Sequence, residues 1–410
     1  MKTKLFFLLM LLGTTLDAQE TPAVLVGADL LLTKQFDLIR GKRVGLVVNH
    51  TSVLSDGQHL ADALAGRSDV KLTALFGPEH GIRGDTTGDV ADTLDPVTKV
   101  PIYSLYGKTY KPTPEMLAEV DVLVFDIQDV GARFYTYIST LGYVLEAAAE
   151  KGIPLIVLDR PNPIGGMQVE GPVTEDSMKS FVGFARVPIR HGMTIGELAL
   201  MYNGQGWLAG GVRARLYVVR MENWRRAMWY DQTGLRWIKP SPNMISLATA
   251  TIYPGTCLFE GVNVSEGRGS DHPFEYIGAP WLKSAQVLET LARAQLKGVK
   301  FETVQFTPTK RPAGASAPKF SGQGCNGISL HVVDRQLFEP VKVGIYLVWA
   351  IRALQPEKFE WRELWFDRLC GTSDVRKTLE AGKPPDEAIA RWSAGLDDFK
   401  RLRAKYLLYD

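Results

Sequence analysis

The sequence predicts an α/β fold whose first half is Rossmann-like, with a mostly parallel sheet. Apolar runs of strand length recur through that half, and helical patterns separate several of them. The runs are nearly continuous rather than alternating, as expected of parallel strands that are covered on both faces. Composition is ordinary for a globular chain, with 45% hydrophobic and 22% charged residues, and 410 residues suffice for two or three domains.

The first half contains strands and helices in alternation. Gly152 marks the end of its clearest amphipathic helix, because glycine readily adopts the left-handed conformation that stops a helix. No G-x-G-x-x-G motif follows the first strand, where Asn49-His50-Thr51-Ser52 stands instead, so we expect no dinucleotide site. We expect strands at 43–48, 70–76, 100–105, 122–125 and 154–158, and helices at 60–65 and 138–151.

The second half is less regular. Thr194 and Glu197 have the spacing of a capping box, so a helix is expected to begin there. The segment 237–243, WIKPSPN, cannot be a regular helix because of its prolines. We place a boundary near residue 235. We also expect strands at 215–219 and 327–333, helices at 194–202, 282–296 and 342–354, a long irregular polar region at 253–278, and a helical, charged tail at 361–406.

The first 18 residues have the pattern of a signal peptide. Lys2 and Lys4 precede the apolar run 5–12, and a cut is expected after Ala18. We therefore expect an exported protein, periplasmic or secreted. No later segment is long and apolar enough to predict a membrane span.

Charge and cysteine content exclude several classes of protein. The net charge is +2, from 47 basic and 45 acidic residues, which gives no electrostatic case for a nucleic-acid partner. The three cysteines, Cys257, Cys325 and Cys370, are too few for a disulfide framework, although one pair could close. No Cys or His spacing indicates a zinc site.

Four polar loops follow apolar strands in the first half. Ends of the same polarity meet at one edge of a parallel sheet, where ligands bind, so these loops should converge. Glycine or proline fixes the backbone of several of them. The loops are 49–52, 77–84, 126–137 and 159–163.

Glu79 is the strongest candidate for acid–base chemistry. It leaves an apolar strand on a short loop between Pro78 and His80, where a half-shielded carboxyl can serve as a general acid. The alternative is that Glu79 caps a helix or pairs with Arg83. The alternative for Asp126 and Arg133 is a structural ion pair.

Other polar residues are candidates for binding. His80 and His191 are expected to contact substrate rather than transfer protons. His191 precedes a helix start, where backbone N–H groups suit an anion, with helix capping as the alternative. Arg268 follows Glu266 in a glycine-rich loop and could bind a carboxylate through two hydrogen bonds, or form a solvated ion pair. Asn243 could bond an amide or hydroxyl, or serve a turn.

Seven motifs carry a resemblance to a known family. They are GPEHGIRG, VFDIQDVGARFYTYISTL, LDRPNPIGG, RHGMTIGELA, WIKPSPN, YPGTCLFEGVNVSEGRG and HPFEYIGAPW, in that order. By them the sequence resembles the exo-β-N-acetylmuramidase (NamZ-like) family of bacterial cell-wall glycosidases, formerly a domain of unknown function. The resemblance runs from Gly41 to Tyr409. It implies a Rossmann-like domain at 19–235 and a smaller α/β domain at 236–410, with the active site in the cleft between them.

The resemblance also implies an activity. The family removes N-acetylmuramic acid from the non-reducing end of peptidoglycan-derived glycans, without a cofactor or a metal. Glu79 matches the family's acid/base glutamate. Glycosidases usually employ two carboxyl groups, and the candidate partners of Glu79 are Asp126, Asp129 and Glu266.

The lactyl carboxylate of muramic acid requires a cation, which Arg133, Arg160 or Arg268 could supply. Tyr135 and Tyr137 could pack on a sugar ring or hydrogen-bond its hydroxyls. The full set of expected substrate-binding residues is Asn49, His80, Gln128, Arg133, Tyr135, Tyr137, Arg160, Asn162, His191, Asn243, Glu266 and Arg268.

Two other functions stay open at this point. One is a metal-dependent esterase or deacetylase of cell-wall glycans that uses His50, His80, Asp126 and Asp129. The other is a glycan-binding protein that retains the cleft without catalysis.

Overall fold

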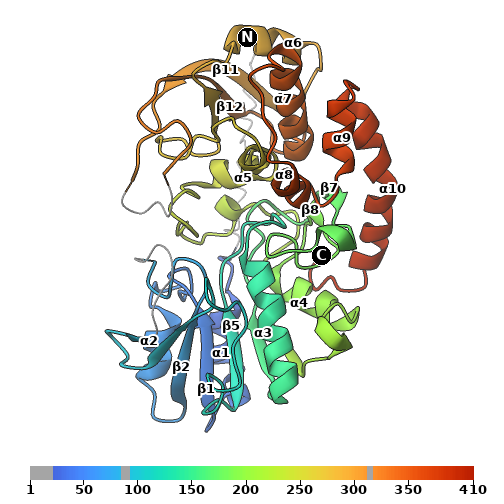
Figure 1. Cartoon of the computed structure of the whole chain (residues 1–410). Helices are drawn as coiled ribbons and strands as arrows, with labels where there is room; N and C mark the ends of the chain where they lie inside the picture. The colour runs from blue at the N-terminus through green and yellow to red at the C-terminus, as the bar shows by residue number, and fades with distance from the viewer. Residues whose placement is uncertain (1–21, 85–92, 312–316) are drawn as a thin grey trace, which may run out of the picture.

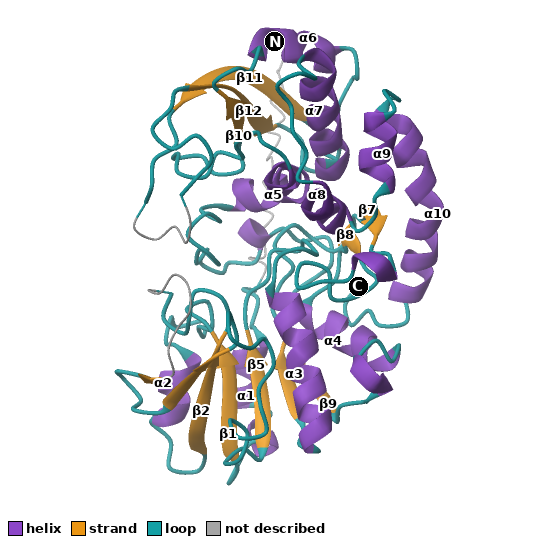
Figure 2. Ribbon diagram, viewed as in Figure 1, coloured by secondary structure: helices purple, strands orange, loops and turns teal. Residues whose placement is uncertain are grey.

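Two sheets, one in each half of the chain, form the framework of the protein (Figures 1 and 2). The computed structural model describes residues 22–84, 93–311 and 317–410. The expected signal peptide, 1–18, lies outside the described residues. The larger sheet, in the first half, has seven strands, and the smaller, in the second half, has three.

The larger sheet confirms the expected α/β fold. Its strand order is β3-β4-β2-β1-β5-β6-β9, and every neighbouring pair is parallel except β3 with β4. The expected strands are present within one or two residues at each end. The strands are β1 (Arg43–Val48), β2 (Lys71–Gly77), β3 (Thr93–Leu94), β4 (Pro101–Ser104), β5 (Val122–Asp126), β6 (Leu155–Leu158) and β9 (Leu216–Val219).

Helices cover both faces of this sheet, which explains the continuous apolar strands. Val44, Leu46 and Val48 of β1 are buried in one core, whereas Val47 is buried in the other. The first core contains residues of α1 (Gly27–Thr33) and α2 (Leu60–Ala65), and the second contains residues of α3 (Tyr137–Lys151) and α4 (Ile195–Gly204).

Local signals at the helix ends are confirmed. Thr194 and Glu197 form the expected capping box at the start of α4. Gly152 ends α3 in the left-handed conformation, with φ 73°. Short 3-10 helices lie at Phe36–Leu38, Asp176–Met178, Ala209–Gly211, Tyr230–Gln232 and Cys257–Gly261.

The smaller sheet is antiparallel, in the order β10-β12-β11. The expected irregular region at 253–278 was partly wrong, because it contains the end of a helix and the start of a strand. The sequence did not predict this helix because Pro254 and Gly255, which disfavour helical structure, lie within it. The elements are α5 (Leu247–Thr256), β10 (Tyr276–Ala279), α6 (Ser284–Ala292), β11 (Val299–Phe306), β12 (Cys325–Val332) and α7 (Pro340–Leu354).

The last part of the chain returns toward the first half (Figure 1). Three helices follow, α8 (Glu363–Cys370), α9 (Asp374–Glu380) and α10 (Pro385–Arg403). Helix α10 packs against β7 (Glu170–Val173), which forms a two-stranded sheet with β8 (Pro188–Arg190). The residues after α10 then reach the larger sheet.

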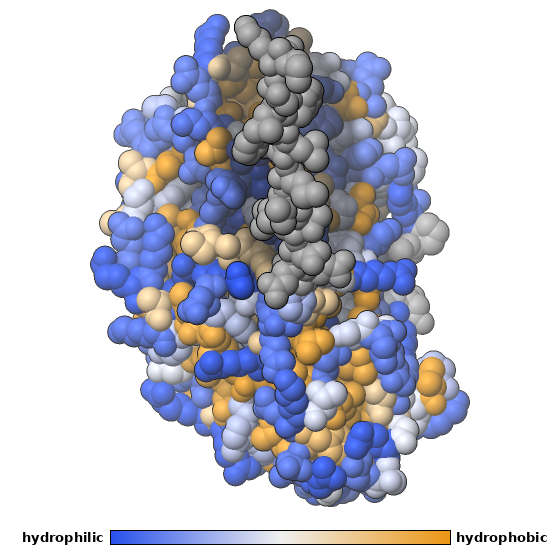
Figure 3. Space-filling model, turned by 180° about the vertical axis from the view of Figure 1, so that it is seen from behind, coloured by the Kyte–Doolittle hydropathy of each residue, from blue (hydrophilic) through white to orange (hydrophobic). Residues whose placement is uncertain are grey.

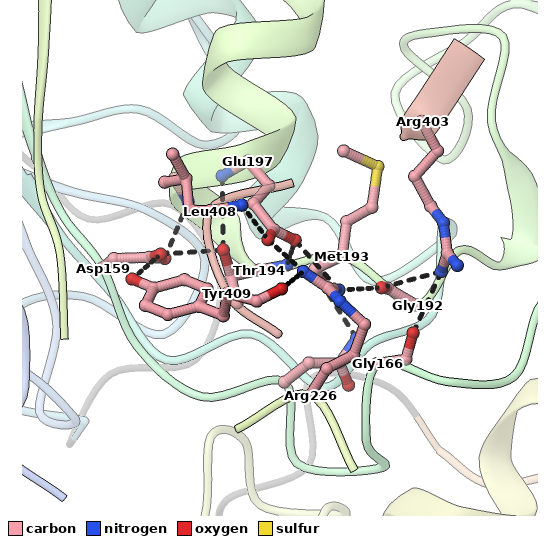
Figure 4. A network of polar contacts seen from close by, with 12 residues as sticks. Asp159, Gly166, Gly192, Met193, Thr194, Glu197, Arg226, Arg403, Leu408 and Tyr409 are labelled. Atoms are coloured by element: carbon pink, nitrogen blue, oxygen red, sulfur yellow. Dashed lines mark hydrogen bonds and ion pairs between the residues drawn. The ribbon is translucent and has the colours of Figure 1, made fainter. Parts of the chain in front are cut away.

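A buried polar network holds this tail in place (Figure 4). The Tyr409 hydroxyl donates to Asp159 Oδ2 at 2.6 Å, and Leu408 N donates to Glu197 Oε1 at 2.8 Å. Glu197 also accepts from the Arg226 guanidinium, and Arg226 N donates to Asp410 O at 2.8 Å. The C-terminal residues, which are themselves half-buried or exposed, are therefore hydrogen-bonded to buried groups of the first half.

Asp159, at the end of β6, lies at the centre of this network. Thr194 Oγ1 and Gly196 N each donate to its carboxyl group at 2.8 Å. Burial raises the pKa of Asp159 to about 7, although the Tyr409 hydrogen bond acts in the opposite direction.

The outer surface mixes polar and apolar side chains. Viewed from behind, hydrophilic residues predominate, and hydrophobic ones are more frequent over the lower part (Figure 3). Among the described residues, none of the helices combines the length and hydropathy required to cross a bilayer.

Candidate active site

A cleft of about 1720 Å³ lies between the two halves of the chain. One wall carries residues from the strand ends of the larger sheet, among them His50, Glu79 and Tyr137. The opposite wall carries residues of the second half, among them Glu266 and Arg268. The cleft therefore opens at the carboxyl edge of a parallel sheet, where such sheets bind ligands.

The four polar loops converge at this edge, as the sequence predicts. Gln128 N donates to Thr51 Oγ1 at 3.0 Å, which joins the loops after β1 and β5. Gln128 Nε2 donates to Pro161 O at 2.8 Å, which adds the loop after β6. Thr136 Oγ1 donates to Glu79 Oε2 at 3.2 Å, which adds the loop after β2.

Glu79 lies half-buried on the wall formed by the strand ends of the larger sheet, close to two tyrosines. The rings of Tyr135 and Tyr137 meet edge to face, with centroids 4.9 Å apart. Burial, and then the Glu79 carboxylate, raise the pKa of Tyr137. The Tyr137 phenol therefore stays protonated at neutral pH and donates a hydrogen bond to Pro240 O, at 2.7 Å.

His80 lies beside Glu79 in a restricted backbone conformation. Its φ is 74°, in the left-handed region that few non-glycine residues adopt. Burial, and then His50 and Arg268, lower the pKa of His80 to about 4. His80 is therefore neutral at physiological pH and suits a hydrogen-bonding role. His50 Nε2 lies 2.7 Å from Lys239 O, so this loop contacts the segment between the two sheets.

The opposite wall contains a charged cluster around Glu266. Lys319 Nζ donates to Glu266 Oε2 at 2.8 Å, and Arg268 Nε lies 3.4 Å from Glu266 Oε1. Arg268 Nη2 also donates to Glu260 Oε1 at 2.7 Å. Burial acts to raise the pKa of Glu266, but Lys319 and Arg268 outweigh it and hold the pKa below its usual range. Glu266 is therefore an ionised carboxylate in the cleft wall.

The expected site residues separate into two layers. Those that line the cleft are Glu79, His80, Tyr135, Tyr137, Asn243, Glu266 and Arg268. Those that do not line it, and are buried beneath or beside it, are Asn49, Asp126, Gln128, Asp129, Arg133, Arg160, Asn162 and His191.

Asp126 and Arg160 form an ion pair in the lower layer. Arg160 Nε and Nη2 donate to the two carboxylate oxygens of Asp126 at 2.5 and 2.8 Å. Asp126 is 0% exposed and Arg160 is 5% exposed, so substrate in the cleft does not reach either charge. Arg160 Nη2 also donates to Val53 O at 2.9 Å. This geometry favours a role in holding the strand-end loops.

Asp129 and His191 lie together in the same layer. Asp129 Oδ2 accepts from Gly131 N at 2.7 Å and lies 3.9 Å from His191 Nε2. Burial raises the pKa of Asp129 to about 7 and lowers the pKa of His191 to about 3. His191 is therefore uncharged at neutral pH and offers no positive charge to an anion.

Arg133 joins distant segments from inside the protein. It is 0% exposed, and its Nη1 donates to Pro172 O at 3.0 Å and to Val187 O at 3.2 Å. Its Nη2 donates to Leu369 O at the end of α8. The alternative of an ion pair with Asp126 was wrong, since Asp126 pairs with Arg160. Asn49 and Asn162 likewise bond backbone and neighbouring side-chain groups.

The four residues of the metal-dependent alternative do not converge. His50 and His80 line the cleft, whereas Asp126 pairs with Arg160 and Asp129 is buried. Within 22–84, 93–311 and 317–410, no group of three or more His, Cys, Asp or Glu is arranged to hold a metal ion.

Sequence reasoning missed several residues of the cleft. Lys319 and Glu260 surround the predicted Glu266–Arg268 pair; Lys319 is close to it only in the fold, whereas Glu260 lies in the same YPGTCLFEGVNVSEGRG motif. Ser241 of the WIKPSPN motif and Tyr253 of the YPGTCLFEGVNVSEGRG motif also line the cleft, but the sequence predicted no role for either. Six further residues that line the cleft were also missed, namely Tyr106, Tyr110, Phe181, Arg362, Trp365 and Arg368.

The fold and cleft define a two-domain α/β protein with a polar, carboxylate-bearing site at the edge of a parallel sheet. Two family models match the chain: "Exo-beta-N-acetylmuramidase NamZ, N-terminal" at residues 44–248 and "Exo-beta-N-acetylmuramidase NamZ, C-terminal" at residues 251–409. The chain belongs to the exo-β-N-acetylmuramidase NamZ family.

Relatives with names or structures agree with this assignment. The chain is 47% identical over 393 residues to the peptidoglycan β-N-acetylmuramidase NamZ of Bacillus subtilis (strain 168), covering 95% of this chain and 92% of the relative. Two crystal structures of DUF1343 family proteins from Bacteroides fragilis each cover 95% of this chain and 99% of their own. They have TM-scores of 0.88 and 0.78 and sequence identities of 38% and 35%.

Proposed function

We propose that this protein is an exo-β-N-acetylmuramidase that releases N-acetylmuramic acid from the non-reducing end of peptidoglycan-derived glycans. One observation supports it most directly. Glu79 and Glu266 line opposite walls of one cleft, in a chain of the NamZ family. Glycosidases usually act through two carboxyl groups that flank the bound sugar.

The two carboxyl groups have different surroundings, which suits different roles. We assign Glu79 as the acid/base, because it is half-buried and receives one hydrogen bond, from Thr136. Glu266 is kept ionised by Lys319 and Arg268, so it suits the base or nucleophile. Of the three candidate partners of Glu79, only Glu266 lines the cleft.

The lactyl carboxylate of muramic acid requires a positively charged partner. Of the three arginines expected to supply it, only Arg268 lines the cleft, whereas Arg133 and Arg160 are buried in other contacts. Tyr135 and Tyr137 offer ring edges and phenol groups to the sugar on the Glu79 side.

The test is a pair of chromogenic substrates, a β-N-acetylmuramide and the matching β-N-acetylglucosaminide. The protein should release chromophore from the first and not from the second. Glu79→Gln should lower kcat by about 10²- to 10⁴-fold, the size of a general acid's contribution, while calorimetry still detects glycan binding. Glu289→Gln, an exposed change on α6 away from the cleft, is the matched control.

Three results would contradict the proposal. Release from the glucosaminide alone would overturn the substrate, and a fully active Glu79→Gln variant would overturn the assigned acid. A parent protein that binds the glycan and turns over neither substrate at any pH would indicate a binding protein.

We also propose that the protein is exported, on the strength of the pattern at residues 1–18. Cell fractionation followed by N-terminal sequencing should find the mature chain outside the cytoplasm, beginning at Gln19. A cytoplasmic chain that still begins at Met1 would contradict export.

A further inference from the structure

The cleft is larger than the proposed terminal sugar requires. Its volume of about 1720 Å³ exceeds the range of about 300–1,000 Å³ that is usual for pockets of small ligands. An exo-acting enzyme needs a place for one muramic acid residue, so most of this space lies beyond it. The inference below rests on the proposed function and concerns what fills the rest of the cleft.

Part of the cleft is lined by an aromatic platform, defined here as Tyr106, Tyr110 and Phe181. The rings of Tyr110 and Phe181 lie 4.1 Å apart with an interplanar angle of 31°, and Tyr106 lies 6.1 Å from each. Tyr110 is 37% exposed, an unusual position for a large aromatic residue within a packed group. Exposed aromatic faces of this kind can pack against the C–H faces of sugar rings.

A second surface in the same cleft is positively charged. Arg362, which immediately precedes α8, and Trp365 and Arg368 within it all line the cleft. The carboxylates of this helix do not neutralise them. Glu363 and Asp367 both pair with Arg376 of α9.

Arg362 and Arg368 form no ion pair with any residue that the structure describes. Two uncompensated guanidinium groups in a cleft attract an anion, because the repulsion between them falls when a carboxylate binds. The lactyl carboxylate of the terminal sugar has Arg268 as its partner in the proposed site. The α8 arginines therefore provide for a further negative charge on the substrate.

Peptidoglycan strands supply such a charge at a regular interval. N-acetylmuramic acid alternates with N-acetylglucosamine, so a strand without peptide stems carries a free lactyl carboxylate on every second sugar. When a peptide stem is attached, this carboxylate is consumed in an amide bond.

We propose that the cleft contains an extended subsite for the remainder of a peptide-free glycan strand. Sugars that follow the terminal muramic acid pack on the aromatic platform, and the lactyl carboxylate of the next muramic acid residue pairs with Arg362 and Arg368. The preferred substrate is therefore a strand of four or more sugars rather than the disaccharide.

The experiment compares two substrates without peptide stems, the disaccharide and the tetrasaccharide with muramic acid at the non-reducing end. Wild-type protein should have a kcat/KM about tenfold higher for the tetrasaccharide, which is the size of one additional charge-assisted contact. Amidation of the internal lactyl carboxylate, or added salt, should remove this advantage.

Variants then test the residues. The double variant Arg362→Gln/Arg368→Gln, and separately Tyr110→Ala, should bring the tetrasaccharide-to-disaccharide ratio of kcat/KM close to one. Arg293→Gln is the matched control, because Arg293 is exposed at the end of α6 and does not line the cleft. Its ratio should equal that of the wild type.

Two outcomes overturn the inference. Equal kcat/KM for both lengths in the wild type removes the subsite, and an undiminished tetrasaccharide advantage in the arginine double variant removes its assignment to α8. Both outcomes leave the proposed activity intact, whereas failure to release muramic acid from either substrate would reject the proposed function itself.

Discussion

Asp126 offers the sharpest test of how the site is built. From sequence it was a candidate catalytic carboxylate, whereas in the structure it pairs with Arg160 beneath the cleft. Replacement of Arg160 by Met retains most of the side-chain volume and leaves Asp126 as a buried, unpaired charge. The change also leaves Val53 O without its donor. The double change Asp126→Asn/Arg160→Met removes both charges together.

The magnitude follows from burial. Both side chains are at least 95% inaccessible, so the loss of one partner should cost about 3–5 kcal/mol of unfolding free energy. That is a large part of a typical total of about 5–15 kcal/mol. The double variant, which leaves no unpaired charge, should lose much less than the sum of the two single variants.

Urea unfolding followed by circular dichroism gives the free energies, and muramide turnover is measured on the same samples. Arg401→Met is the matched control, since Arg401 and its partner Asp398 are exposed on α10, and it should cost less than about 0.5 kcal/mol. A positioning role predicts that the double variant regains stability and turnover together. If Arg160→Met costs less than about 1 kcal/mol, or the double variant is stable and wholly inactive, the reasoning is wrong and Asp126 acts in catalysis.

Three further predictions concern the framework. Tyr409→Phe removes the hydroxyl that donates to Asp159 and should cost about 1–3 kcal/mol in thermal unfolding. Burial raises the pKa of Asp129 from 3.8 to about 7, so the folded state binds more protons than the unfolded state between these values. Stability should fall as pH rises through that window, and Asp129→Asn should flatten the fall. Gly255→Ala should cost about 1–3 kcal/mol, because the added Cβ would lie 1.9 Å from Pro340 O.

Matched controls accompany these variants. Tyr217→Phe removes an exposed hydroxyl on β9 and should leave the unfolding midpoint unchanged. Gly324→Ala adds a Cβ that meets nothing within 4 Å, so it should be neutral. A Gly255→Ala variant as stable as Gly324→Ala would refute the close approach of α5 and α7. A pH profile that is no flatter in Asp129→Asn would refute the burial of a protonated carboxyl.

The larger sheet was predictable because its strands are buried on both faces. An apolar run such as Val122–Phe125 has no other stable position, and capping signals such as Thr194 with Glu197 act within one turn of helix. The second half was harder to predict. Helix α5 carries Pro254 and Gly255 near its end, and β11, an edge strand with the sequence VKFETVQF, loses its apolar–polar alternation at Glu302 and Thr303. Tertiary packing decides the conformation of both.

The sequence predicted where the site lies, but not which of its residues line the cleft and which are buried beneath it. The loops after parallel strands must meet at one edge, so Glu79 and Asp126 were expected to lie near one another. Whether a side chain points into the cleft or down toward a neighbouring strand end depends on its position within the loop. Asp126, the last residue of β5, is still in the sheet and faces Arg160, whereas Tyr135 and Tyr137 lie farther along and reach the cleft.

The C-terminal tail has a consequence for how the protein is made. Leu408 and Tyr409 bind Glu197 and Asp159, which are buried in the first half, and Asp410 O accepts from Arg226 N. These hydrogen bonds can form only after residues 408–410 have been synthesised. Until then Asp159 and Glu197 lack the partners that the C-terminal residues provide. A purification tag fused directly to Asp410 would therefore disturb the hydrogen bonds that Leu408 and Tyr409 form with the first half of the chain.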